Sequence, residues 1–317
     1  MIGVIVVLSI IFYSANKAFL AWSNITSLFS NFAVYGIMAI GMMLVISTGN
    51  IDVSVGAQLA TVSMVISELV VNGKVTGIVL IVIISICLGL ALGIINGALV
   101  AYLKIPALIV TLGTLSIMRG LLLLILGSNW ISGMPGWFTA IARTIPFNLG
   151  FKITAYVWVL LYIVTFFIMY HTVYGRRILA VGANPEGARR IGYNPSSSYI
   201  FAFAFMGVMS GLGALFYTAN TGTAQPVAGV GYEMTLIAAV ALGGTSFAGG
   251  KISILGTFLA TLLLGIIENG MVIAKVPVYW QELVTGVVIT VAIISSASSF
   301  LTQRKARVDK VKKGALS

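Results

Sequence analysis

Long apolar runs alternate with short polar connections along almost the whole chain. We place these runs at residues 2–14, 30–48, 55–72, 76–103, 105–127, 153–171, 197–218, 232–248, 252–272 and 278–300. Most of them are long enough to cross about 30 Å of hydrocarbon as an α-helix. The alternation typical of strands is absent, and a helix satisfies all of its own backbone groups inside a bilayer. The pattern predicts an all-α polytopic membrane protein with about ten transmembrane helices.

The composition agrees with this pattern and excludes several classes of protein. Of the 317 residues, 59% are hydrophobic and only 8% are charged, whereas soluble domains are about 25% charged. The net charge of +11 does not indicate nucleic-acid binding, because most cations flank apolar runs. His171 and Cys87 are the only residues of their types, so neither a multi-ligand metal cluster nor a nucleophile with its base can be assembled. We expect no enzyme activity and no bound cofactor or metal, and we expect Cys87 to be a small buried side chain.

The cations predict how the chain crosses the membrane. We describe residues 1–317 as a single transmembrane domain, with a first half at 1–171, a polar connection at 172–196, a second half at 197–300 and a basic tail at 301–317. If the connection and the tail are both cytoplasmic, twelve cations lie inside and five outside, as the positive-inside rule requires. The inner set is Lys104, Arg176, Arg177, Arg189, Arg190, Lys251, Arg304, Lys305, Arg307, Lys310, Lys312 and Lys313, and the outer set is Lys17, Lys74, Arg143, Lys152 and Lys275. The sequence therefore predicts a multi-pass protein with a cytoplasmic C-terminus.

A short internal repeat relates the two halves. The letters GIING at 93–97 followed by KIP at 104–106 recur as GIIENG at 265–270 followed by KVP at 275–277. The copies end the fourth and ninth predicted spans, so they have opposite orientations in the membrane. This is the pattern of the inverted repeats from which many transporters are built. Chance similarity between glycine-rich apolar segments is the alternative.

Two polar, glycine-containing segments interrupt the apolar pattern, at 48–56 and at 243–251. Non-helical backbone at membrane depth is stable only where protein or a water-filled cavity satisfies it. The second segment is not a phosphate-binding P-loop, because Thr245 and Ile252 stand where that motif needs Gly and Ser or Thr. We therefore expect protein or a water-filled cavity to surround both segments.

Five polar residues are candidates for lining the translocation pathway or for packing helices together. They are Asn50, Asp52, Asn96, Thr111 and Asn269. Asp52 could line a cavity, but its place before an apolar run favours a carboxylate that caps the following helix.

Four other ionisable residues fall near or inside the predicted spans. We expect Arg119 to pair with a carbonyl or a carboxylate inside the helix bundle, with direct contact to a substrate as the alternative. Glu233 is interpreted as a first-turn residue. Glu68 and Glu268 are expected to be solvated at the outer ends of their spans.

The polar connection contains a predicted helix of its own. Asn184 is a suitable N-cap, Pro185 suits the first helical position and Glu186 the first turn. The helix should end at Gly192, with Arg189 and Arg190 in its last turn, where cations are favoured. A capped helix too short to span the membrane is suited to contact a partner protein. A solvated loop that merely follows the positive-inside rule is the alternative.

Four segments resemble the permease subunits of ABC importers for ribose and related small sugars. They are STGNIDVSVGAQLA at 47–60, NGALVAYLKIPALIVTLGTLSIMRG at 96–120, GRRILAVGANPEGARRIG at 175–192 and GYEMTLIAAVALGGTSFAGGKISILGT at 231–257. Their order and spacing match the family over nearly the whole chain. The stretch at 103–135 is more similar to permeases for autoinducer-2 or rhamnose than to a plain ribose permease.

The resemblance implies a type II importer permease of ten helices in the bacterial inner membrane. Such a permease pairs with an identical or related second chain, receives its solute from a periplasmic or lipid-anchored binding protein, and is driven by a cytoplasmic ATPase that uses ATP and Mg. The segment 174–192 would then be the ATPase-coupling loop, with Gly182, Asn184, Pro185, Glu186, Arg189, Arg190 and Gly192 as its coupling residues. The alternative functions are a secondary transporter or channel driven by an ion gradient and a purely structural membrane subunit.

Overall fold

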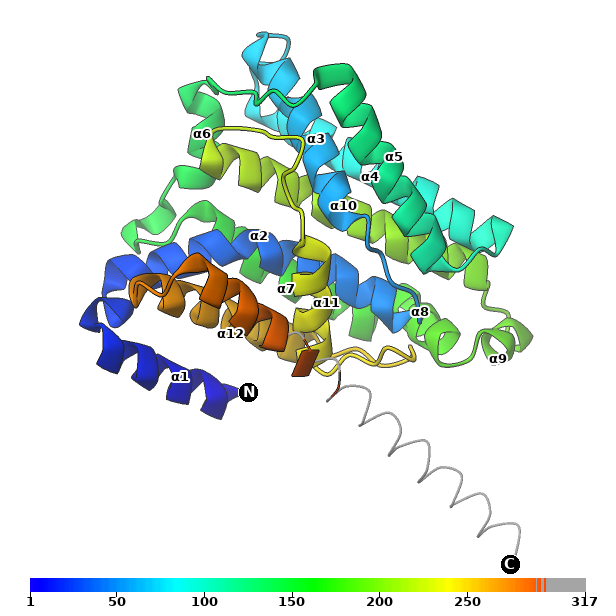
Figure 1. Ribbon diagram of the computed structural model, residues 1–317. Helices are drawn as coiled ribbons and strands as arrows, with labels where there is room; N and C mark the ends of the chain where they lie inside the picture. Colours follow the sequence, from blue (N-terminus) through cyan, green and yellow to red (C-terminus); the bar gives the residue numbers. More distant parts are fainter. Residues whose placement is uncertain (289, 292–293, 295–317) are drawn as a thin grey trace, which may run out of the picture.

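The fold is built from helices alone in the described part of the chain. The computed structural model describes residues 1–288, 290, 291 and 294, and the predicted tail at 301–317 lies outside them. The helices are α1 (Ile2–Ala15), α2 (Trp22–Ser47), α3 (Val55–Val71), α4 (Ile78–Leu103), α5 (Ala107–Leu126), α6 (Gly136–Arg143), α7 (Ile153–His171), α8 (Val173–Ala183), α9 (Pro185–Arg190), α10 (Pro195–Thr221), α11 (Tyr232–Leu242) and α12 (Ile254–Ile273) (Figure 1). Residues 278–288 are also helical.

The predicted apolar runs correspond to helices, with three differences. The first is that α2 begins at Trp22 rather than near residue 30, because its polar first turns contact other parts of the protein. The second is that α11 ends at Leu242, where the prediction continued the helix to 248. Gly244 has a positive φ of 85°, so the helix ends where the polar, glycine-containing segment 243–251 begins. The third is that the helices α6 and α8 were not predicted.

Six helices in the described residues are long and apolar enough to cross a membrane: α2, α4, α5, α7, α10 and α12. Helices α1, α3 and α11 are apolar but shorter. Of these, α3 and α11 each follow a non-helical segment, at 48–54 and 222–231. The structure therefore describes a polytopic helical protein, while the count of ten spans stays a prediction.

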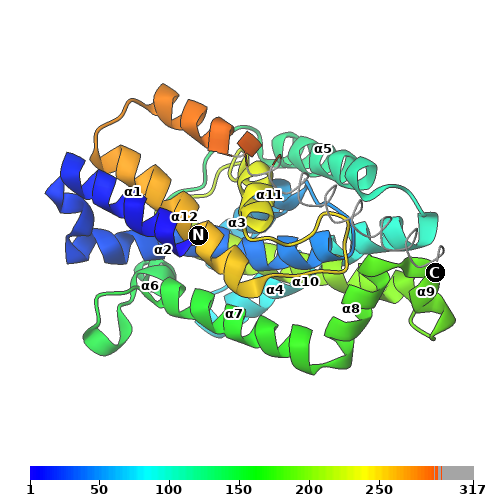
Figure 2. The ribbon, with the colours of Figure 1, turned by 90° about the horizontal axis from the view of Figure 1, so that it is seen from below.

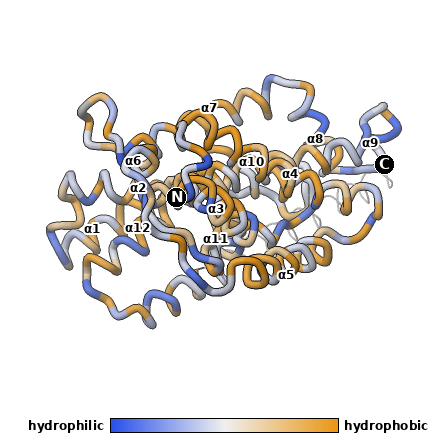
Figure 3. The backbone as a smooth tube through the Cα atoms, turned by 90° about the horizontal axis from the view of Figure 1, so that it is seen from above, coloured by the Kyte–Doolittle hydropathy of each residue, from blue (hydrophilic) through white to orange (hydrophobic). Residues whose placement is uncertain are grey.

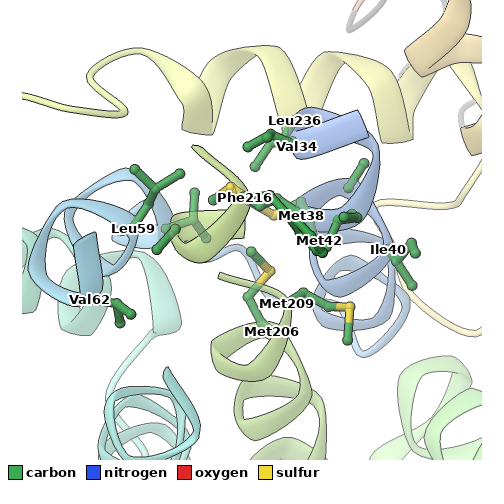
Figure 4. Close-up of a cluster of buried hydrophobic side chains, with 14 of the residues drawn as sticks. Val34, Met38, Ile40, Met42, Leu59, Val62, Met206, Met209, Phe216 and Leu236 are labelled. Carbon is green, nitrogen blue, oxygen red and sulfur yellow. The ribbon is translucent and has the colours of Figure 1, made fainter. Parts of the chain in front are cut away.

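The core lies between α2, α3, α10 and α11. Figure 4 shows side chains from all four helices meeting there, including Met38, Leu59, Met206 and Leu236. Helices α4 and α10 approach especially closely, since a Cβ added at Gly89 would overlap the carbonyl oxygen of Gly207. Close packing through small residues is the usual way in which helices associate in membranes.

Apolar side chains also cover much of the outside. Leu124 and Ile125 on α5 and Val79 on α4 are among the most exposed large apolar residues, and Cys87 on α4 is exposed too, which corrects its predicted burial. An apolar exterior of this extent is suited to hydrocarbon. Figure 3 shows the hydrophobic stretches along the helices and many of the hydrophilic residues at the connections.

The connections sort into two groups at opposite ends of the bundle. At one end Ser196, in the first turn of α10, donates to the carbonyl of Ala101 near the end of α4, and the backbone N–H of Gly250 donates to the carbonyl of Ser47 at the end of α2. At the other end Ile131 pairs with Ala224. Figure 2 shows α8 and α9 far from the start of α2. This sorting agrees with the alternation of sides that the cations predict.

Candidate functional site

A fully buried polar network joins the non-helical segment 48–54 to α3 and α4. The Asp52 carboxylate accepts from the backbone N–H of Ser54 at 2.8 Å, from the Ser54 hydroxyl at 2.5 Å and from Gln58 Nε2 at 3.1 Å. Asn96 Nδ2 donates to the Ser54 hydroxyl at 2.8 Å. Asp52, Ser54 and Gln58 are 0% exposed. Asp52 therefore binds the backbone at the start of α3, as the capping interpretation expects.

Thr111 attaches α5 to the same segment. Its hydroxyl accepts from the backbone N–H of Val53 at 3.3 Å and donates to the carbonyl of Ala107 at 2.9 Å. Three of the five candidate pathway residues, Asp52, Asn96 and Thr111, thus meet around one buried segment. Their hydrogen bonds join this segment to α3, α4 and α5, so they help to pack these elements together.

The other two candidate pathway residues, Asn50 in the same segment and Asn269 on α12, are not hydrogen-bonded to this network. Asn50 Nδ2 donates to Thr48 at 2.9 Å. Asn269 on α12 exchanges hydrogen bonds with Asn24 on α2, at 2.9 Å and 3.1 Å. Asn24 lies in the part of α2 that the sequence did not predict as helix, so its pairing could not be recognised from the pattern. The five residues do not form a single site.

Arg119 holds the non-helical segment 222–231 against α5. Its guanidinium donates to the carbonyl of Pro226, and also to that of Ala228 at 2.7 Å. This confirms the expectation that Arg119 pairs with carbonyls inside the bundle. The segment itself packs closely on α3, because a Cβ at Gly56 would overlap the carbonyl oxygen of Gly229. The sequence did not predict that residues 222–231 pack against α3 and α5, because these contacts join parts of the chain that are far apart in sequence.

The predicted helix of the polar connection is present as α9. The Asn184 side chain accepts from the backbone N–H of Gly187 at 3.0 Å, Pro185 is the first helical residue and Gly192 has a φ of 86°. Glu186 and Arg189 approach each other to 4.0 Å and are both largely exposed. Since Arg190 is also exposed, α9 presents charges of both signs at its surface.

Gly182 anchors this connection to the rest of the molecule. A Cβ at Gly182 would overlap the carbonyl oxygen of Ser47 and lie 2.6 Å from the nitrogen of Gly250. A Cβ at Gly249 would lie 2.5 Å from the carbonyl oxygen of Gly182, and the N–H of Gly250 donates to Ser47 at 2.8 Å. We call these four residues the glycine junction. The sequence predicted Gly182 as a coupling residue, but its contacts with Ser47 and the 249–250 turn appear only in the structure.

The acidic residues of the spans differ in their surroundings. Glu233 lies in the first turn of α11, as expected. Glu68 accepts from Asn72 in an exposed bond of 2.6 Å. Glu68 and Glu268 were both expected to be solvated, but both are half-buried. Two of the five cations predicted to lie outside, Arg143 and Lys152, both bind Asn220. Arg143 donates to the backbone carbonyl of Asn220, and Lys152 donates to its side chain. Burial, and then the charge of Arg143, lower the pKa of Lys152.

No group of three or more His, Cys, Asp or Glu that could hold a metal ion occurs in the described residues. What the structure brings together instead is irregular backbone inside an apolar bundle, fixed by buried amides and hydroxyls, and a charged short helix at one end. This arrangement suits movement of a polar solute past packed helices better than covalent chemistry.

Comparison with known proteins decides the family. Residues 24–293 match the model of the family described as branched-chain amino acid transport system / permease component. The chain belongs to this permease family. A relative from Bacillus subtilis, the ribose import permease protein RbsC, is 36% identical to the permease over 288 residues, which cover 91% of this chain and 89% of that protein.

A second group of relatives is named for the import of a different solute. The autoinducer 2 import system permease protein LsrC of Yersinia pseudotuberculosis is 33% identical over 274 residues, covering 86% of this chain and 77% of that protein. No solved structure matches the permease. The family and these relatives confirm the resemblance seen in the sequence, and the permease is a transport subunit rather than a catalytic enzyme.

Proposed function

We propose that this permease is one transmembrane half of an ATP-driven importer for a small sugar or sugar-like solute. The observation that carries the proposal is similarity over most of the chain to permeases named for ribose and autoinducer-2 import. A ribose-type monosaccharide, rhamnose or autoinducer-2 is the expected solute class. Selectivity can reside in a separate binding protein, so the permease needs only weak polar contacts that are easily released.

The proposed partners follow from this role. A cytoplasmic ATPase would consume ATP and Mg, a second permease chain would complete the path, and a periplasmic or lipid-anchored binding protein would deliver the solute. The proposed location is the bacterial inner membrane, with the C-terminus cytoplasmic. The coupling residues would be Gly182, Asn184, Pro185, Glu186, Arg189, Arg190 and Gly192. The exposed charges of α9 and the close backbone contacts of Gly182 support this assignment, because a coupling element must both meet the ATPase and move with the bundle.

Packing supports an inverted repeat between the two halves of the proposed permease. Helix α4 packs on α10 as α12 packs on α2, and α3 contacts α10 as α11 contacts α2. Lys104 and Lys275, which occupy matching positions of the sequence repeat, have left-handed φ values of 55° and 57°. Positive φ is uncommon for lysine, so the shared conformation argues against chance similarity.

Reconstitution with candidate partners tests the proposed function. The permease, an ATPase and a binding protein are placed in proteoliposomes, and uptake of D-ribose, rhamnose and autoinducer-2 is measured with ATP inside. We expect uptake of one of these solutes to require ATP and all partners. Uptake that persists on an ion gradient alone would contradict the importer and favour a secondary transporter.

A charge exchange tests the role of α9 in the same system. Glu186→Arg combined with Arg190→Glu keeps the net charge, and both side chains are exposed, so insertion should be unaffected. Because charge complementarity guides docking, we expect ATPase association and ATP-dependent uptake to fall. Exchange of half-buried Glu68 and exposed Lys74 at the opposite end, as Glu68→Lys with Lys74→Glu, is the control. Unchanged uptake in the α9 variant would show that the charges of this helix do not contribute to coupling with the ATPase.

A further inference from the structure

Three aromatic rings form a column between α2 and α11. Phe32 stacks on Tyr35 with ring centroids 5.6 Å apart, and Tyr35 stacks on Tyr232 at 4.2 Å with planes inclined by 30°. Tyr232 is the first residue of α11 and follows the non-helical segment 222–231. It is half-buried, and its neighbours Val230 and Met234 are exposed. The column therefore ends on a ring beside an open surface of the bundle.

A carboxylate without a cation lies beside this column. Glu268 lies on α12 three residues after Gly265, where a Cβ would lie 2.7 Å from the ring of Phe32, so it is on the face of α12 that contacts the column. The single ion pair among the described residues joins Arg189 to Glu186, so Glu268 has no cationic partner there. A lone carboxylate inside an apolar bundle is costly unless it has a function. Its acceptor oxygens and the tyrosine hydroxyls together make a polar edge next to an aromatic face.

This combination matches the chemistry of a sugar. The C–H groups of a sugar ring carry partial positive charge and pack on the negative face of an aromatic ring, while its hydroxyls donate to a carboxylate. Resting on the proposed import function, we propose that Tyr232, Tyr35 and Glu268 form an intramembrane contact site for a polyhydroxylated solute on its way through the permease. Tyr232 supplies the stacking face and Glu268 accepts hydroxyl hydrogen bonds. The site is separate from the buried network around Asp52.

The transport test uses the reconstituted transporter with ATPase and ribose-loaded binding protein. Glu268→Gln keeps the shape of the side chain but weakens acceptance from hydroxyls, and Tyr232→Leu removes the ring. We expect ribose uptake per ATP hydrolysed to fall about tenfold in both, while stimulated ATP hydrolysis stays near wild type. Tyr232→Phe should lose less uptake. Glu68→Gln, at a glutamate that is also half-buried, and Tyr102→Leu, at an exposed tyrosine, are the controls.

A binding test on the permease alone keeps the proposal independent of its partners. Saturation-transfer NMR on detergent-solubilised wild type should show transfer to the C–H groups of D-ribose but not to L-valine, with loss of transfer in Tyr232→Leu. If Tyr232→Leu does not fold, loss of transfer to ribose is measured in Glu268→Gln instead. Absence of transfer to ribose in the wild type, or unchanged uptake per ATP in Glu268→Gln, would overturn the site. ATP-dependent uptake by the wild type would still support the proposed function in that case, whereas its absence would contradict the function itself.

Discussion

At the scale of single residues, buried polar groups fix backbone that is not helical. Arg119 supplies guanidinium donors to the carbonyls of Pro226 and Ala228, and the Asp52 carboxylate accepts three bonds at the start of α3. Irregular backbone at membrane depth needs such partners, because lipid offers none. The sequence predicted both roles from residue type and position, but not which carbonyls or side chains would be the partners.

Removing the Arg119 guanidinium should loosen the segment 222–231. Arg119→Met leaves the two carbonyls without donors, and each unsatisfied buried group costs about 1–3 kcal/mol. We expect the melting temperature of the detergent-solubilised permease to fall by several degrees, with Arg119→Lys in between because lysine cannot span both carbonyls. Lys74→Met, at an exposed lysine, is the control. An unchanged melting temperature in Arg119→Met would show that the segment is held by packing alone.

Substitutions at Asp52 distinguish a packing role of its carboxylate from a role in the translocation pathway. Oε1 of Gln58 is buried without a hydrogen-bond partner, so in Asp52→Asn the Gln58 amide can turn over and accept from the new Nδ2. We expect Asp52→Asn to keep both its melting temperature and its uptake. Asp52→Ala leaves Ser54 and Gln58 without an acceptor and should be destabilised by a few kcal/mol, roughly 1–3 for each lost partner. Normal stability with lost uptake in Asp52→Asn would instead assign the carboxylate to the pathway.

At the scale of elements, apolar runs and cap residues predicted most of the helices. Helix α9 follows from Asn184, Pro185 and Gly192, because capping depends on neighbours in sequence. The predicted beginning of α2 was wrong, because contacts between distant segments determine it, and the predicted end of α11 was wrong, because the backbone turns at Gly244. Asn24 pairs with Asn269 across 245 positions, and no local pattern contains that information. For the same reason the glycine junction was only partly foreseen.

A substitution in the glycine junction tests whether the polar connection at 172–196 is needed for transport. In Gly182→Val the new side chain would overlap the carbonyl oxygen of Ser47, so α8 must move away from α2 and the 249–250 turn. We expect ATP-dependent uptake to fall roughly tenfold, since coupling between sites is typically worth about 1–3 kcal/mol, while membrane insertion is retained. Gly77→Ala, where a Cβ meets nothing within 4 Å, should behave as wild type. Wild-type uptake in Gly182→Val would show that motion does not pass through this junction.

At the scale of the whole molecule, the structure joins a charged exterior helix to a tightly packed apolar bundle. The ends of α2 and α8 and the turn before α12 meet at the glycine junction, and α2 runs from there through the core to the Asn24 pair with Asn269. A displacement of α9 and α8 would therefore act on α2 and on the turn before α12 through the close backbone contacts of this junction. This continuity is the physical basis for assigning α8 and α9 to the transmission of force from a separate ATPase.

Site-specific cross-linking in the assembled transporter tests this assignment most directly. In a Cys87→Ser background, Glu186→Cys on α9 and Lys74→Cys at the opposite end are treated with a short bifunctional thiol reagent, and the products are identified by mass spectrometry. The account predicts a cross-link from position 186 to the ATPase whose yield changes with ATP, and none from position 74. An active transporter in which position 186 reacts freely with a soluble thiol probe and never cross-links to the ATPase would contradict it.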